Sequence, residues 1–202
     1  MKVWSKMQTN TFRVTLKSMP GSQFMAGCPV SSTKGPNETH EQFEERTWKE
    51  KIRTNKQGFV VLNQFALKNA LEGAAKRLKR KIPGEGKSQF TKLFMQGVMV
   101  GSMPVLKTAD GKACKPDDFV GQRLFVPSDG TRGGGKRVTR IFPTIDEWMC
   151  EMDVIVIDPK ITEEVLKEHI SEAGVFIGLG SMRVENGGVN GRFIVHAIKK
   201  VG

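Results

Sequence analysis

Alternating apolar and polar side chains predict the first strand over residues 11–16. Phe12, Val14 and Leu16 occupy one face, and the residues between them are polar. This period of two is typical of a strand that buries one face. Similar alternation predicts a long strand over residues 147–157 and a last strand over residues 192–198. In the last strand, Phe193, Val195 and Ala197 are expected on the face opposite to Ile194, His196 and Ile198.

Helical spacing is clearest after Asn63, which is a plausible N-cap. The apolar positions that follow recur every three or four residues, and the expected helix closes before Pro83 and Gly84. These positions are Phe65, Leu67, Ala70, Leu71, Ala74, Ala75 and Leu78. A second helix is expected from Thr162, its cap, to Ala173, with acidic residues in its first turn and Gly174 as its end.

Three stretches carry weaker signals. Residues 47–52 alternate well enough to favour a strand over a short helix. Residues 90–100 are apolar enough for a strand or a buried helix, and periodicity does not decide between them. Residues 22–39 are rich in glycine, proline and serine, so we expect an irregular excursion there, with outer limits at residues 20–45.

Residues 100–147 form a loop-rich insertion. Strand-like segments at 123–126 and 137–142 flank a run of glycine and basic residues at 128–136, which predicts a flexible basic β-hairpin. Around this insertion the order is strand, helix, strand, then strand, helix, strand. The prediction is a single α+β domain over residues 1–202 with a modified ferredoxin-like core, the split βαβ arrangement also found in RRM-like domains.

Composition places the chain among globular proteins, with 38% hydrophobic and 26% charged residues. Cys28, Cys114 and Cys150 are far apart, so we expect three free thiols, no disulfide framework and no metal. No cofactor motif is present, and a Walker loop is excluded because the glycines are not followed by Gly-Lys-Ser/Thr. No window approaches the roughly 18 apolar residues of a membrane span, so no membrane partner is expected and the protein should stay in the cytoplasm.

The net charge is +11, which points to a polyanionic partner. The charge is uneven: residues 46–92 hold thirteen Lys or Arg against three acids, and residues 146–172 hold nine acids against two lysines. One part of the molecule is therefore expected to bind an anion, while the acidic helix packs against the basic part of a neighbouring copy.

The candidate binding residues are basic side chains in three regions, which suit backbone recognition of a single strand. The alternative for the helix is a solvated face that complements the helix dipole. Phe24, Trp48 and Phe142 are possible base-stacking residues, with core packing as their alternative. The candidates are Lys68, Lys76, Arg77, Arg80 and Lys81 after Asn63, Arg132, Lys136, Arg137 and Arg140 on the hairpin, and Arg183 and Arg192 near the carboxy terminus.

Arg183 and Arg192 lie in a glycine-rich segment, residues 177–193. Glycine lets backbone N–H groups approach an anion, but it also permits tight packing, and both interpretations remain open. A Rossmann fingerprint fits poorly, because these glycines follow a helix and precede a strand.

This segment resembles the carboxy-terminal glycine-rich loop of the RAMP superfamily, which includes guide-RNA-binding backbone subunits of CRISPR effector complexes. Residues 61–71 are similar to that family's strand-to-helix motif: Lys68 matches its lysine, while Asn69 and Glu72 stand where glycine and arginine occur. The carboxy-terminal part also resembles uncharacterised proteins of bacteriophages and prophages, which implies a phage-encoded relative acting in a bacterial cytoplasm.

The resemblance implies a ferredoxin-like core with a projecting hairpin thumb, here residues 100–147, and subunits that stack along RNA. Some members cleave RNA with an aspartate after the first strand. Because this sequence has no aspartate before Asp110, that activity is not carried over.

The function expected is non-catalytic binding of single-stranded RNA or DNA with little sequence preference and with self-assembly along the strand. One alternative is a protein-interaction factor, such as a mimic of a CRISPR backbone subunit that interferes with effector assembly. Another is an enzyme using His40, Glu41, Glu44 and Glu45 as acid and base groups.

Overall fold

The computed structural model describes residues 9–130, 133 and 135–202. Its main element is a five-stranded antiparallel sheet in the order β3, β7, β1, β8, with β4 pairing with the other half of β7. The strands are β1 (Asn10–Ser18), β3 (Val98–Val100), β4 (Leu106–Thr108), β7 (Trp148–Val156) and β8 (Phe193–Lys200).

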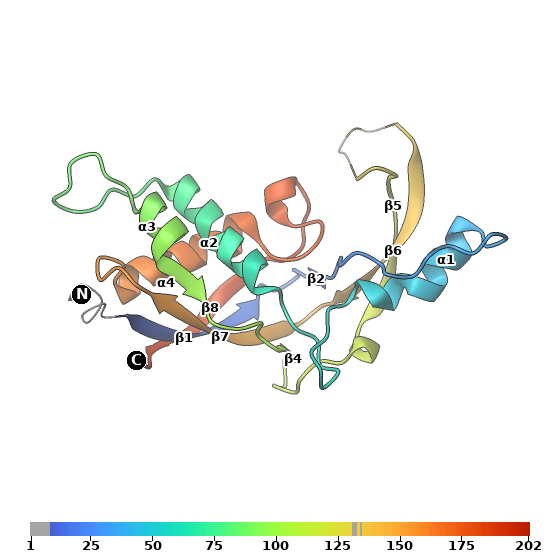
Figure 1. Cartoon of the computed structure of the whole chain (residues 1–202), viewed down its shortest axis with the longest axis horizontal. Helices are drawn as coiled ribbons and strands as arrows, with labels where there is room; N and C mark the ends of the chain where they lie inside the picture. Colours follow the sequence, from blue (N-terminus) through green and yellow to red (C-terminus); the bar gives the residue numbers. More distant parts are fainter. Residues whose placement is uncertain (1–8, 131–132, 134) are drawn as a thin grey trace, which may run out of the picture.

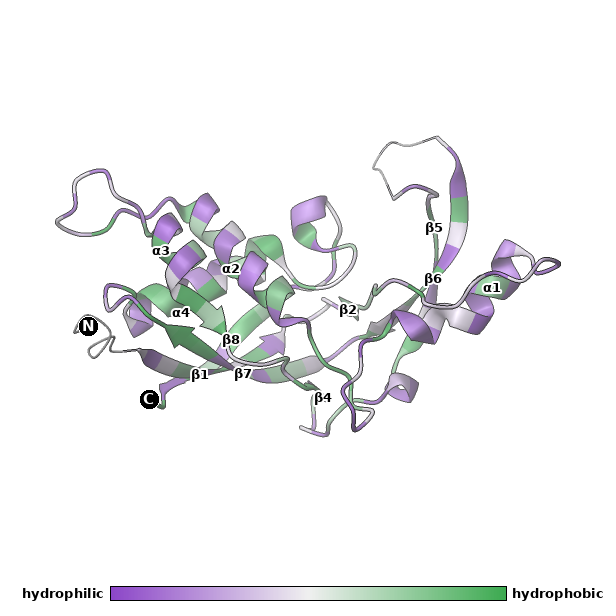
Figure 2. Cartoon of the chain, viewed as in Figure 1, coloured by the Kyte–Doolittle hydropathy of each residue, from purple (hydrophilic) through white to green (hydrophobic). Residues whose placement is uncertain are grey.

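Three helices, α2 (Gln64–Leu78), α3 (Phe90–Gly97) and α4 (Glu163–Glu172), lie over one face of this sheet (Figure 1). Helix α2 lies in the long connection from β1 to β3, and α4 lies in the connection from β7 to β8. The core lies between the layers, and hydrophobic residues gather along the central strands there (Figure 2). No helix of the described residues is both long and apolar enough to cross a membrane.

Both N-caps predicted from the sequence are present. The side chain of Asn63 accepts from the N–H of Phe65, and the Thr162 hydroxyl accepts from the N–H of Val165. Helix α2 ends at Leu78, several residues before Pro83, because Lys79 adopts a left-handed conformation. Residues 90–100 form a helix and then a strand, the two alternatives left open by the sequence, since α3 passes directly into β3.

Helix α4 ends at Glu172, close to the expected end at Ala173, but Gly174 does not stop the helical path. The chain continues as one π-helical turn, η3 (Ala173–Ile177), and Gly178 ends it with φ 74°. A Cβ at Gly174 would lie 2.1 Å from the carbonyl oxygen of Phe193. Gly174 is therefore needed for the close approach of β8 and does not break the helix.

Strand β8 also departs from simple alternation. Phe193 is buried and Val195 and Ile198 pack against the core, whereas Ala197 is exposed. The pairing of β8 with β1 shifts register between Thr15 and Leu16. This β-bulge moves Ile198 to the core face in place of Ala197.

A second antiparallel sheet lies at the other end of the molecule (Figure 1). It has the order β2, β6, β5. The predicted hairpin is β5 paired with β6, and Pro127 lies opposite Arg137. The excursion supplies β2, so residues 22–39 are not wholly irregular. These strands are β2 (Phe24–Met25), β5 (Val120–Pro127) and β6 (Arg137–Ile145), with short helical turns η2 (Pro116–Asp118) and η4 (Val184–Asn186) elsewhere in the chain.

The strand expected over residues 47–52 is wrong, because the chain there forms α1 (His40–Thr47) and the 3₁₀ turn η1 (Trp48–Lys51). Thr39 and Gln42 form a capping box that starts α1. The buried positions are Glu44, Thr47 and Lys51, which is helical spacing. Two of them are charged, so a search for apolar periodicity misses the helix.

A buried ion pair attaches this helical segment to the hairpin. The Nζ atom of Lys51 lies 2.6 Å from Oε2 of Glu44, and both side chains are about 95% buried. Oε2 accepts from the N–H of Ile141 at 2.8 Å, and Nζ donates to the carbonyl of Ile141 at 2.7 Å. Burial raises the pKa of Glu44, but the bonds from Lys51 and Ile141 and the charge of Lys51 outweigh it, so its pKa lies below the ordinary value.

Candidate nucleic-acid interface

The glycine-rich segment is hydrogen-bonded to the excursion. Ser181 N–H donates to the carbonyl of Met25 at 2.8 Å, and Gly191 N–H donates to the carbonyl of Gln23 at 2.7 Å. Leu179 N–H donates to the carbonyl of Gly191 at 3.0 Å, which closes the segment into a loop. This loop, residues 178–191, therefore has a fixed position beside β2.

Several of its glycines serve tight packing. A Cβ would lie 1.8 Å from the carbonyl oxygen of Met182 at Gly188, and 1.9 Å from that of Leu179 at Gly191. At Gly180 it would lie 2.4 Å from the carbonyl oxygen of Met25. Of the two interpretations left open by the sequence, packing is supported at these three positions.

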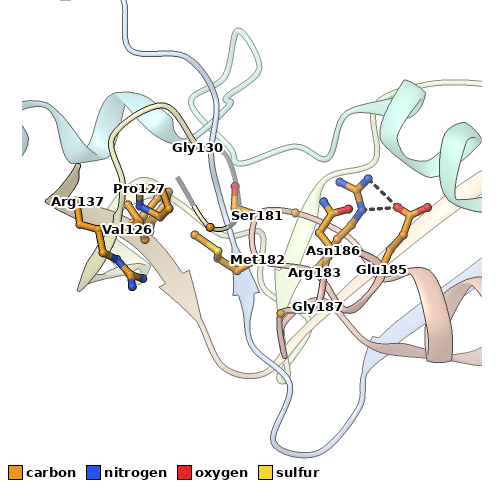
Figure 3. Close-up of a pocket in the computed structure, with 14 residues that line it drawn as sticks. Val126, Pro127, Gly130, Arg137, Ser181, Met182, Arg183, Glu185, Asn186 and Gly187 are labelled. Carbon is orange, nitrogen blue, oxygen red and sulfur yellow. Dashed lines mark hydrogen bonds and ion pairs between the residues drawn. The ribbon is translucent and has the colours of Figure 1, made fainter. Parts of the chain in front are cut away.

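A cleft of about 980 Å³ separates the loop from the hairpin. Val126, Pro127 and Arg137 line it from the hairpin, and Met182 and Arg183 line it from the loop (Figure 3). Met182 has φ 51°, a conformation rare for residues with side chains, and its side chain extends towards the hairpin (Figure 3). Such strain is often found at binding sites.

Two smaller hollows adjoin this cleft. One, of about 340 Å³, is lined by Asn69, Gly73 and Lys76 on α2. The other, of about 280 Å³, lies between the loop, β2 and the start of α2. Gly180 and Arg183 line all three spaces, which therefore adjoin around the loop between α2 and the hairpin; we refer to the three together as the groove.

Three of the candidate residues line this groove, namely Lys76, Arg137 and Arg183. Lys76 is exposed and forms no ion pair with a described residue. Arg137 donates to the carbonyl of Phe125 at 3.1 Å, and its guanidinium lies 5.6 Å from that ring's centroid. Arg183 pairs with Glu185 at 2.8 Å (Figure 3). Lys136 is exposed next to Arg137.

Other candidates on α2 are used inside the molecule. Lys68 pairs with Glu72 at 2.9 Å and donates to the carbonyls of Phe94 and Met95, which satisfies the end of α3. Arg77 pairs with Glu172 of α4 at 2.7 Å. These residues therefore have structural partners.

Arg80 pairs with Glu168 of α4. Glu168 and Glu172 of the acidic helix are thus paired within this chain, and packing of that helix against a neighbouring copy stays a prediction. The acidic helix packs on its own α2, and the ion pairs across that contact join side chains about ninety positions apart in the sequence.

Three other described candidates, Lys81, Arg140 and Arg192, do not line the groove. Lys81 is exposed and follows the end of α2 at Leu78. Arg140 donates to the carbonyl of Ser128 at 2.8 Å and Arg192 donates to that of Val175 at 3.2 Å. Arg132 falls outside the described residues.

The possible stacking residues differ in exposure. Phe24 is buried and packs edge-on against Phe119 and Trp148, so it belongs to the core. Trp48 is half-buried against Gly121, whereas Phe142 lines the cleft.

Sequence reasoning missed three features of the groove region. Phe125 on the hairpin is 64% exposed, Met182 projects into the cleft, and Glu185 is an acid on the groove wall. The alternation of β5 could have indicated that Phe125 faces outwards, but neither Met182 nor Glu185 carries a sequence signal.

Three of the four proposed acid and base groups have other partners, whereas Nε2 of His40 is buried without a hydrogen-bond partner among the described residues. Glu41 and Glu45 both pair with Arg123, and Glu44 is buried against Lys51. Cys114 and Cys150 are buried free thiols, and burial raises the pKa of each to about 12. Among the residues that the structure describes, no group of three His, Cys, Asp or Glu is placed to hold a metal ion.

No protein-family model matches the sequence, and no curated protein matches it either. Solved structures do match. The cryo-EM structure of the Type III-B Cmr-beta bound to cognate target RNA aligns with 96% of this chain at 9% identity and a TM-score of 0.45; the chain spans 61% of the length of that one.

The crystal structure of Cmr6 from Pyrococcus furiosus aligns with 95% of this chain and 100% of its own, at 12% identity and a TM-score of 0.50. At this identity the likeness concerns the fold alone. The chain is therefore a mixed α and β protein with antiparallel sheets and a RAMP-like fold, as the sequence resemblance implied.

Proposed function

We propose that this protein is a non-catalytic single-strand-binding protein that holds the sugar-phosphate backbone of RNA or DNA in the groove between α2, the glycine-rich loop and the hairpin. The observation that carries the proposal is the groove itself, where Lys76, Arg137 and Arg183 come from three separate elements. Cations spaced along a groove are the usual means of backbone binding.

The topology supports a finer description of the fold. The strand order β3, β7, β1, β8, with α2 and α4 as the two crossovers, is the order of a split βαβ core. We propose that the core is a modified ferredoxin-like one and that β5 and β6 form its thumb. The RAMP-like fold supports nucleic acid over other polyanions, since the sequence resemblance is to guide-RNA-binding subunits.

Glu185 is an acidic residue on the groove wall, so its effect on binding should be opposite to that of the basic residues. Its carboxylate holds Arg183 at 2.8 Å and lines the groove, where it repels phosphate. Binding a strand requires Arg183 to exchange this carboxylate for a phosphate. Removing the carboxylate should therefore strengthen binding, whereas removing groove cations should weaken it.

The test is fluorescence anisotropy with labelled single-stranded RNA, single-stranded DNA and duplex DNA across a salt series. Lys76→Ala with Lys136→Ala should weaken single-strand binding and reduce the salt slope by about 1.4, since each phosphate contact contributes roughly 0.7. Lys87→Ala with Lys92→Ala is the matched control, because it removes the same charge from exposed positions at the α3 end of the molecule. Glu185→Gln should tighten binding.

Equal effects of the two lysine pairs would mean that net charge, and not the groove, controls binding. The sugar preference of the wild type chooses between RNA and DNA. Self-assembly along the strand is part of the proposal, and light scattering with and without oligonucleotide tests it: a monomer under both conditions removes it.

A second candidate function is the protein-interaction factor. It is favoured by exposed apolar side chains around the start of α2: Phe65 is 67% exposed, and Met95 and Met103 are each 46% exposed. Hydrogen bonds from Lys68 to Met95 and from Leu62 to Pro104 hold these segments together. Absence of binding to every oligonucleotide would favour this candidate.

A further inference from the structure

The hollow of about 280 Å³ behind the glycine-rich loop has apolar walls and a basic rim. Phe24, Val60, Leu62 and Leu179 line it and are each at least 90% buried. Its size is close to the lower end of the range for small-ligand pockets in proteins. The space therefore suits a flat apolar group rather than a long chain.

The residues around its mouth are small, which keeps it open. A Cβ at Gly27 would lie 1.9 Å from Oγ of Ser181, so the Ser181 side chain packs directly on the backbone of Gly27. Gly180 lies against the ring of Phe24, where a Cβ would approach to 3.0 Å. On the α2 side the rim is Ala66, an exposed residue whose methyl group leaves the entrance free.

Two guanidinium groups stand at this rim. Arg183 lines both the hollow and the cleft, so a group inside the hollow lies next to the path proposed for the backbone. Arg53 is exposed and makes no ion pair with a described residue. A flat apolar ring joined to an anionic backbone meets both requirements.

We propose that this hollow receives one unstacked nucleobase from the strand bound in the groove, with the adjoining phosphates against Arg53 and Arg183. The inference rests on the proposed function and deepens it, because it adds a base contact to a backbone contact. Proteins that bind single strands commonly take splayed bases into apolar or aromatic surroundings. Most of the wall residues are hydrophobic, with Lys51, Asn63 and Ser181 as polar exceptions, so shape and stacking would select a base in general and not one sequence.

Blocking the entrance tests the proposal. Ala66→Trp places a large ring on the rim at an exposed helical position, and Ala197→Trp makes the same change at an exposed position on β8, away from the groove. Both variants are compared with the wild type by anisotropy on two ligands. One is a short oligonucleotide of the preferred sugar, and the other is the same sugar-phosphate chain without bases. Circular dichroism checks that each variant is folded.

The wild type should bind the base-containing strand at least about 5-fold more tightly than the abasic chain, the lower limit for one stacked base. Ala66→Trp should lose this preference while its salt slope stays at the wild-type value, because phosphate contacts set the slope. Ala197→Trp should behave as the wild type.

The two proposals fail differently. If the wild type binds neither ligand, the proposed function is wrong. If the wild type binds both ligands equally, or if Ala66→Trp keeps the preference for bases, the groove remains but the base pocket is wrong. A loss of affinity for the abasic chain in Ala66→Trp would also overturn the pocket, since the substitution would then act on backbone binding.

Discussion

Replacing Glu44 with alanine should destabilise the protein strongly, because Lys51 would be left buried without its counter-charge. Nζ of Lys51 would keep the carbonyl of Ile141 at 2.7 Å but lose Oε2 of Glu44 at 2.6 Å. The N–H of Ile141 would lose its acceptor as well. Breaking a buried pair by removing one partner costs about 3–5 kcal/mol.

For a chain of this size, each kcal/mol shifts the melting temperature by roughly 2–4 °C. Glu44→Ala should therefore lower Tm by roughly 6–20 °C. Urea denaturation followed by circular dichroism measures the corresponding loss of unfolding free energy. The double variant Glu44→Leu with Lys51→Met removes both charges and keeps apolar volume, so it should recover part of the loss, while the N–H and carbonyl of Ile141 remain without these partners.

Recovery of stability in the double variant would show that Glu44→Ala destabilises the protein through the unpaired charge and not through simple loss of packing. The reasoning is refuted if Glu44→Ala stays within about 1 kcal/mol of the wild type, a loss too small for an unpaired buried charge. It is also refuted if the double variant is no more stable than the single one.

Two further predictions concern stability. His169 is buried and stacked on Phe94 at 4.0 Å, and burial lowers its pKa to about 4. The unfolded chain therefore takes up the proton first, so stability should fall by about 3 kcal/mol as pH drops from about 6.5 to 4. His169→Phe should flatten that part of a pH series of urea midpoints, and an unchanged slope would contradict the assignment. Gly188→Ala would force a Cβ against the Met182 carbonyl and should cost about 1–3 kcal/mol by thermal unfolding. Gly135→Ala, which meets nothing within 4 Å, should stay within about 0.5 kcal/mol, and equal losses would show that contact with Met182 is not the cause.

Elements with an apolar period were predictable from the sequence. The helix after Asn63 and the strand over residues 147–157 form near the expected positions because their periodic residues face one core. The hairpin also forms where expected, although most of β5 is not buried, because strand-like segments flank its glycine-rich tip. Segments stabilised by polar contacts were not. The helix over residues 40–47 buries Glu44, and its partner Lys51 follows in the next turn, so apolar periodicity gives no signal.

The sequence predicted that basic residues are abundant, but not which of them share one surface. The sequence shows how many basic residues α2 carries, but not that Arg77 and Arg80 meet Glu172 and Glu168. Such pairs depend on tertiary packing between distant segments. The same holds for the groove, where Arg183 comes beside hairpin residues only through the contacts of the loop with β2.

The two-residue strand β2 is hydrogen-bonded to both walls of the cleft, the hairpin strand β6 and the glycine-rich loop. Phe24 and Met25 pair with Ile145 and Thr144 of β6, and the carbonyl of Met25 also accepts from Ser181 of the loop. Both walls are thus hydrogen-bonded to β2, and separating them would break hydrogen bonds on one side of this strand or the other. If the proposed function holds, these bonds limit how far the two walls can separate, so little binding energy would be lost in ordering the groove around a strand.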